Sequence, residues 1–233
     1  MSGATAPGTS KLRTVARRAT GRDPRAPGQG PAAERCDLCA EPLDPEHRHL
    51  LDLLSDAVSC ACRPCSLLFD HQEAGGAHYR LLPRRRLRLA GQPIDDALWA
   101  ALGVPVELAF FTRAGSSGDV TARYPSPLGT LRATTDPGVW ARVTAAHPTL
   151  ATLEDDVEAL LVHRAGERPE HWLLPLDDCY RLAALVRAHW TGLGGGAEVW
   201  RHVGAFFDEL RVLPEHSGPD TGSTAQEATW VSP

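Results

Sequence analysis

The 233-residue sequence contains no run of about 18 apolar residues, which excludes a helix that crosses a membrane. Its first 30 residues hold basic side chains but lack the apolar stretch of roughly 7 to 15 residues that a secretory signal requires. We therefore expect a cytoplasmic protein. In that reducing compartment, clustered cysteines are more often metal ligands than disulfides.

Lysine is almost absent, since Lys11 is the only one, and arginine carries nearly all of the positive charge. The formal net charge of -5 is unevenly distributed. Residues 1–34 hold six basic and two acidic side chains, whereas residues 91–214 hold ten basic and sixteen acidic ones. An acidic surface repels a phosphate backbone, so we expect no nucleic-acid partner for the main part of the chain.

Periodic apolar patterns are missing at both ends of the chain. Residues 1–34 and 215–233 are rich in small residues and proline, and we expect both to be disordered tails. Between them, residues 35–90 hold five of the six cysteines, and residues 91–214 have the apolar content of an ordinary domain. The sequence therefore predicts a small cysteine-rich module followed by a larger domain.

The apolar residues of the larger domain follow strand-like spacing in some segments and helical spacing in others. Strands are expected at residues 104–112, 119–124, 157–163 and 171–176, the last two as a hairpin. Helices are expected at residues 95–102 and 139–146, after Asp177 as an N-cap, and around an apolar face formed by Val199, Val203, Phe206, Phe207 and Leu210. This order predicts an α+β fold, in which a mostly antiparallel sheet is covered by helices and preceded by a zinc-ribbon-like module.

Four cysteines form two C-x-x-C pairs, Cys36 with Cys39 and Cys62 with Cys65, separated by 22 residues. Two intervening residues let a tight turn direct both sulfurs of a pair to one point. Two such turns supply the four tetrahedral thiolates that zinc prefers, at about 2.3 Å. Because four thiolates leave no position for a substrate, the pattern predicts a structural metal site.

Cys60, His47 and His49 leave the ligand set open, since any of them could replace a neighbouring cysteine. Residues 49–54 and 57–60 are expected to form the hairpin that returns the chain to the first pair. We expect Cys60 to face the module's own core and the two histidines to share one face of an exposed strand. Cys179 has helical spacing with apolar neighbours and is expected to be buried.

The other charged clusters have ordinary structural interpretations. The arginines at positions 80, 84, 85, 86 and 88, in the segment 79–89, could bind phosphate or an acidic partner, but we favour a solvated strand or a strip that docks on the acidic domain. The carboxylates at residues 154–156 and 177–178 fit a polar turn and a helix cap better than acid/base chemistry or a cation site. No nucleophile and base are recognisable, so we expect no catalytic residues and no enzyme.

Several segments of the chain resemble a known family. They are Cys36-Asp-Leu-Cys39, His47-Arg-His-Leu-Leu-Asp52, Cys60-Ala-Cys-Arg-Pro-Cys-Ser-Leu-Leu-Phe69, and residues 104–111 and 171–177. They are similar to bacterial proteins encoded beside uptake nickel-iron hydrogenases of the high-affinity, aerobic type, over most of residues 35–213. The resemblance implies a setting and no reaction: an accessory or assembly protein whose partners are hydrogenase subunits or maturation factors.

A second function is compatible with the same four sulfurs. Iron in place of zinc would make the site rubredoxin-like and the protein a one-electron carrier. Against this alternative, Ala40 and Ser66 stand where typical rubredoxins have glycine after each pair. Thiol-disulfide exchange by a single pair is a weaker alternative, because one metal ion accounts for both pairs.

Overall fold

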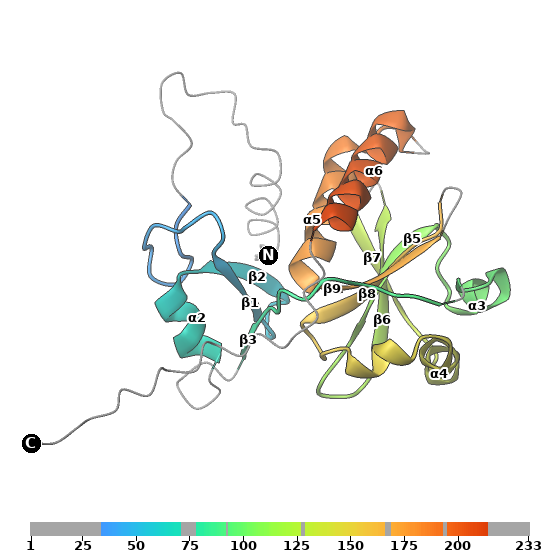
Figure 1. Ribbon diagram of the computed structural model, residues 1–233, viewed down its shortest axis with the longest axis horizontal. Helices are drawn as coiled ribbons and strands as arrows, with labels where there is room; N and C mark the ends of the chain where they lie inside the picture. The colour runs from blue at the N-terminus through green and yellow to red at the C-terminus, as the bar shows by residue number, and fades with distance from the viewer. Residues whose placement is uncertain are drawn as a thin grey trace, which may run out of the picture.

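The structure is a computed structural model that describes residues 34–70, 78–91, 93–126, 129–165, 169–192 and 195–213. The predicted tails therefore lie outside the described residues, apart from Glu34. Within these ranges the chain forms two antiparallel sheets and the helices that cover them (Figure 1). The predicted α+β class is confirmed.

The small sheet has the strand order β2-β1-β3, with β1 at Arg48–Asp52, β2 at Ala57–Ala61 and β3 at Tyr79–Leu81. The predicted hairpin of β1 and β2 is present, and Asp56 closes its turn with a positive φ of 52°. Helix α2 (Arg63–Asp70) follows β2 directly. Helix α2 was not predicted from the sequence, whereas β3 lies in the arginine-rich segment 79–89, for which a strand was one of the two favoured structures.

The large sheet has the order β4-β9-β8-β5-β6-β7. Its strands are β4 (Leu87–Arg88), β5 (Leu108–Arg113), β6 (Val120–Ser126), β7 (Gly129–Thr134), β8 (Glu158–His163) and β9 (Glu170–Pro175). The predicted hairpin is β8 with β9, and the strand predicted at residues 119–124 is β6, paired with β5. The strand predicted at residues 104–112 is wrong at its start, because β5 begins only at Leu108.

Helices cover both faces of the large sheet (Figure 1). On one face, α5 (Leu176–His189) and α6 (Gly196–Val212) pack on alternate residues such as Leu108 and Phe110. On the other, α3 (Asp96–Ala101) and α4 (Pro137–Ala146) pack on Ala109 and Phe111. The α6 face predicted from Val199 to Leu210 is buried, as is Cys179 on α5. No helix among the described residues is long and apolar enough to cross a membrane.

Aspartate side chains cap the N-termini of α3 and α4, but not that of α5. Asp95 caps α3 by accepting a hydrogen bond from the Leu98 N–H at 2.7 Å, and Asp136 caps α4 in the same way. The prediction that Asp177 caps α5 is wrong, because the helix begins one residue earlier, at Leu176. Asp177 lies in the first turn, and its carboxylate is free to contact the small sheet.

His171 on β9 contacts His147 at the end of α4, and this buried pair makes the free energy of unfolding depend on pH. His171 is 4% exposed and its ring centroid lies 5.0 Å from that of His147. Burial, with smaller contributions from His147 and Arg164, lowers the pKa of His171 to about 4. An unfolded histidine has a pKa of about 6.5, so the unfolded chain binds more protons than the folded chain between these values.

We expect this difference to remove roughly 2 kcal/mol of stability as the pH falls from about 6.5 to about 5. His171→Leu should flatten that part of the pH profile relative to the wild type, as measured by urea unfolding at each pH. His202→Gln, at a partly exposed position on α6, serves as the control. Equal slopes for His171→Leu and the wild type would contradict the assignment.

Candidate metal centre

The fold brings together the four cysteines of the two C-x-x-C pairs. Cys36 and Cys39 lie in the turn before β1, Cys62 follows β2, and Cys65 lies in the first turn of α2. Their four Sγ atoms lie within 4.8 Å of one another, and Cys39 Sγ is 3.6 Å from Cys62 Sγ. Tetrahedral bonds of about 2.3 Å place two sulfurs about 3.8 Å apart, so this arrangement fits a zinc ion.

The two pairs are built differently. The first forms a tight turn, in which Ala40 N–H donates to the Cys36 carbonyl at 2.9 Å. The second lies at the start of a helix and not in a second tight turn, which is where the structure departs from the expected ribbon. Pro64 is tolerated there because the first helical N–H groups have no partner within the helix. The positive end of α2 favours thiolate at the second pair.

The pKa values of the clustered thiols indicate that a bound cation would stabilise the four-cysteine cluster. Burial raises the pKa of the Cys36 thiol, but backbone N–H groups of Cys62, Leu38 and Cys39 outweigh it and lower that pKa to about 7. The pKa of Cys65 is raised by burial and by the thiols of Cys62, Cys39 and Cys36. Four sulfurs this close can all be thiolates only if a positive ion neutralises them, so the donor set suits a bound metal.

The cluster is largely shielded from water. Cys36, Cys62 and Cys65 are 3%, 8% and 9% exposed and pack with Leu50 and Ala61 in a small core. Cys39 is exposed. A core of this size contributes little folding energy, so we expect the module to depend on its metal.

Ala40 gives a direct test of the first turn, because it adopts a φ of 64°. A left-handed conformation costs an L residue about 1 kcal/mol relative to glycine. We expect Ala40→Gly to stabilise the metal-loaded protein by about that amount, measured as a higher urea midpoint. A lower midpoint would contradict the assigned conformation.

The structure separates Cys60, His47 and His49 from the four-cysteine cluster. Leu50 and Ala61 mark the face of the hairpin that covers the cluster, whereas Cys60 lies on the opposite face with Leu51. The prediction that Cys60 faces the module's own core is therefore wrong. The histidines do contact each other, but the strand is only partly exposed there: the His47 and His49 side chains are 8% and 30% exposed, and His49 contacts Asp177 of α5.

His49 makes the contact with α5. Its Nδ1 lies 2.5 Å from Asp177 Oδ2, between residues 128 positions apart in the sequence. Burial lowers the pKa of His49, but Asp177 and Cys60 outweigh that effect and raise it to about 10. No local pattern in the sequence indicated this pairing.

The arginine strip docks on the larger part of the chain, which is one of the two structures favoured above. Arg85 pairs with Glu158 at 2.5 Å, Arg86 with Asp178 at 2.6 Å and Arg80 with Asp156 at 3.7 Å. Two of these carboxylates belong to the acidic clusters noted in the sequence. Since the charges of these three pairs satisfy one another, they hold the structure together.

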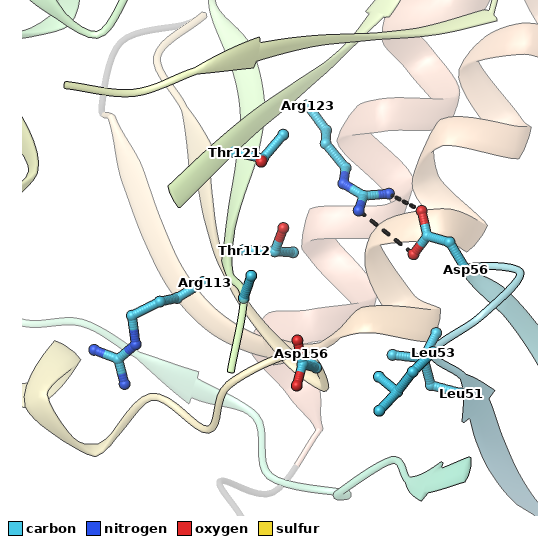
Figure 2. A pocket seen from close by; sticks show the side chains of 9 residues that line it. Leu51, Leu53, Asp56, Thr112, Arg113, Thr121, Arg123 and Asp156 are labelled. Carbon is cyan, nitrogen blue, oxygen red and sulfur yellow. Dashed lines mark hydrogen bonds and ion pairs between the residues drawn. The ribbon is translucent and has the colours of Figure 1, made fainter. Parts of the chain in front are cut away.

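A small polar pocket lies where the β1–β2 turn meets β5 and β6 (Figure 2). Arg123 and Asp56 face each other across it, with Arg123 Nη1 2.7 Å from Asp56 Oδ2, and the Tyr180 hydroxyl also contacts both side chains. The pocket holds about 100 Å³. Small-molecule sites are usually at least about 300 Å³, so this pocket is small for one, and its charged side chains pair with each other.

Comparison with known proteins places the chain in a family without assigning it an activity. A family model described as "Family of unknown function (DUF5947)" matches residues 35–213. That range includes all four cysteines of the cluster and the large sheet. No curated protein and no solved structure matches the chain.

Proposed function

The chain belongs to the DUF5947 family of unknown function, and from its own site we propose that it is a zinc-binding accessory or assembly protein. It works in the cytoplasm through protein–protein contacts and catalyses no reaction. The four-cysteine cluster carries this proposal, because four convergent sulfurs complete the coordination shell of one zinc ion. A complete shell suits a metal that holds a binding surface in shape.

The surface around the cluster offers contacts for a partner. Leu67 and Leu68 on α2, the helix that carries Cys65, are 57% and 50% exposed. The two α2 leucines follow Cys65 by two and three residues, so the metal site fixes the helix that presents them. Exposed leucines on an ordered helix are typical of protein contacts.

The resemblance to proteins encoded beside nickel-iron hydrogenases supports the choice of partner. We propose that α2 contacts a hydrogenase subunit or a maturation factor. The arginine strip contributes little, because four of its five guanidinium groups are already paired with carboxylates of the same chain, and Arg84 donates to the Glu46 carbonyl.

A copurification experiment tests this proposal. In a strain that makes both proteins, the tagged wild type should retain hydrogenase subunits or a maturation factor. Leu67→Glu combined with Leu68→Glu should reduce the recovery at least about tenfold. Val212→Glu, at an 81% exposed apolar residue on α6, is the matched control and should have no effect. Normal hydrogenase activity in a deletion strain, with no copurified subunit, would contradict the accessory role.

One observation favours the alternative of an iron-binding electron carrier. Cys39 is exposed, and an exposed sulfur ligand is where an electron would pass to a partner. Iron and zinc both accept four thiolates, so geometry does not separate them. The colour and metal content of the purified protein distinguish iron from zinc.

A further inference from the structure

A second group of potential ligands lies on the opposite side of the hairpin from the four cysteines. One donor atom each from His47, His49 and Cys60 lies within 4.8 Å of the others. The two imidazoles meet through their Nε2 atoms at 3.2 Å. Cys60 is the direct cross-strand partner of His49, so the register of β1 and β2 fixes this arrangement.

Each imidazole is oriented through its other nitrogen. His47 Nδ1 lies 2.9 Å from the backbone oxygen of Asp44, and His49 Nδ1 lies 2.5 Å from Asp177 Oδ2. Both oxygens only accept hydrogen bonds, so both Nδ1 atoms carry the proton. Metal-binding histidines are usually held in this way, with the second nitrogen donating to a carbonyl or a carboxylate.

Because both protons are on Nδ1, the two Nε2 atoms that face each other are available as ligands. With both Nδ1 atoms protonated, the two Nε2 atoms can face each other at 3.2 Å either through one shared proton, as a hydrogen bond, or through a metal ion that takes the place of that proton. Two metal–nitrogen bonds of about 2.0 to 2.1 Å in tetrahedral geometry place their nitrogens about 3.3 to 3.4 Å apart. The observed separation is close to that distance.

We propose that His47, His49 and Cys60 form a second metal site, separate from the four-cysteine cluster, that binds a transition ion such as Zn²⁺ or Co²⁺. Two imidazoles and a thiolate suit such ions and not Ca²⁺ or Mg²⁺, which prefer oxygen. The site is partly sheltered, since the side chains of His47 and His49 are 8% and 30% exposed and Cys60 is 7% exposed. Three protein ligands leave a fourth position for a water molecule or an outside ligand.

The site lies where the small sheet meets the large domain. His47, His49 and Cys60 belong to the hairpin, while Asp177, which orients His49, belongs to α5. A bound ion would therefore strengthen the contact between the two parts of the chain. This role is independent of the four-cysteine cluster and of the proposed partner.

Counting the metal ions on the full-length chain tests the proposal. After incubation with excess Co²⁺ and desalting, the wild type should hold two metal ions, zinc and cobalt together, per chain. His49→Gln and Cys60→Ser should each hold one, and Cys60→Ser should also lose a thiolate-to-cobalt absorption band. The ion that remains shows that the four-cysteine module is still folded. Cys179→Ala and His202→Gln are the matched controls and should keep both ions.

Asp177→Asn provides a second variant that leaves all three ligands in place. Losing the carboxylate partner of a ligating histidine costs about 10- to 100-fold in metal affinity, so the second ion should bind that much more weakly. This variant decides the question if His49→Gln loses both ions through unfolding. A single ion on the wild type would overturn the proposal and leave a proton as the charge between the two imidazoles. Loss of the second ion only in His202→Gln would also overturn it, because His189, Glu198 and His202 form another candidate group.

Discussion

Cys36→Ser is expected to release the structural metal ion and unfold the small sheet together with α2. Cys36 is 3% exposed and its sulfur accepts backbone N–H groups, so serine cannot replace it as a soft, charged ligand. Zinc binding supplies on the order of 10 kcal/mol of folding energy in comparable small modules. The expected result is loss of zinc, with loss of hydrogen-exchange protection in β1, β2 and β3.

Cys179→Ala is the matched control for this change, because it also removes a buried thiol but lies on α5, outside the cluster. It should keep the zinc and the protection of the small sheet. Retention of zinc at wild-type affinity by Cys36→Ser would show that another residue, such as Cys60, serves as the fourth ligand.

Arg85→Met is expected to destabilise the protein by about 3 to 5 kcal/mol. Glu158 is fully buried, and Arg85 donates to both of its carboxylate oxygens, through Nε at 2.9 Å and Nη2 at 2.5 Å. Methionine keeps much of the volume but leaves the buried carboxylate without its cation. Burial already raises the pKa of Glu158, so the variant should take up a proton there. Urea unfolding measures the loss.

Two further variants make this prediction specific. Arg88→Met removes an arginine from the same strip, but Arg88 is 47% exposed and lies 3.9 Å from Glu170, so it should cost about 1 kcal/mol or less. Adding Glu158→Gln to Arg85→Met should restore part of the lost stability. A loss below about 1 kcal/mol for Arg85→Met would show that the pair does not hold the strip in place.

Much of the large sheet could be predicted because its apolar pattern is local. The run at residues 157–163 and its partner after a short polar turn identify β8 and β9, and helical spacing identifies α5 and α6. Strand β7 was missed because its Gly129–Thr134 sequence has little apolar alternation. Helix α2 was missed because it has only eight residues and contains Pro64. The start of β5 was misplaced because Pro105, inside the apolar run, lies outside the strand.

The metal centre could be predicted for a different reason. The C-x-x-C spacing limits where two sulfurs can point, so the meeting of Cys36, Cys39, Cys62 and Cys65 follows from two local turns and one hairpin. The second group depends on a cross-strand register and on Asp177, far away in the sequence. The same holds for Arg85 with Glu158 and Arg123 with Asp56, since ion pairs between distant segments leave no local pattern.

The metal content of full-length protein purified without air tests the central claim most directly. We expect a colourless protein without iron that holds zinc at the four-cysteine cluster, with one Zn²⁺ per chain lost in Cys36→Ser and kept in Cys179→Ala. A red protein with one iron per chain would contradict the claim of a structural zinc site and favour the electron carrier. A folded small sheet with no metal at the four cysteines would contradict both the structural zinc site and the iron-binding electron carrier.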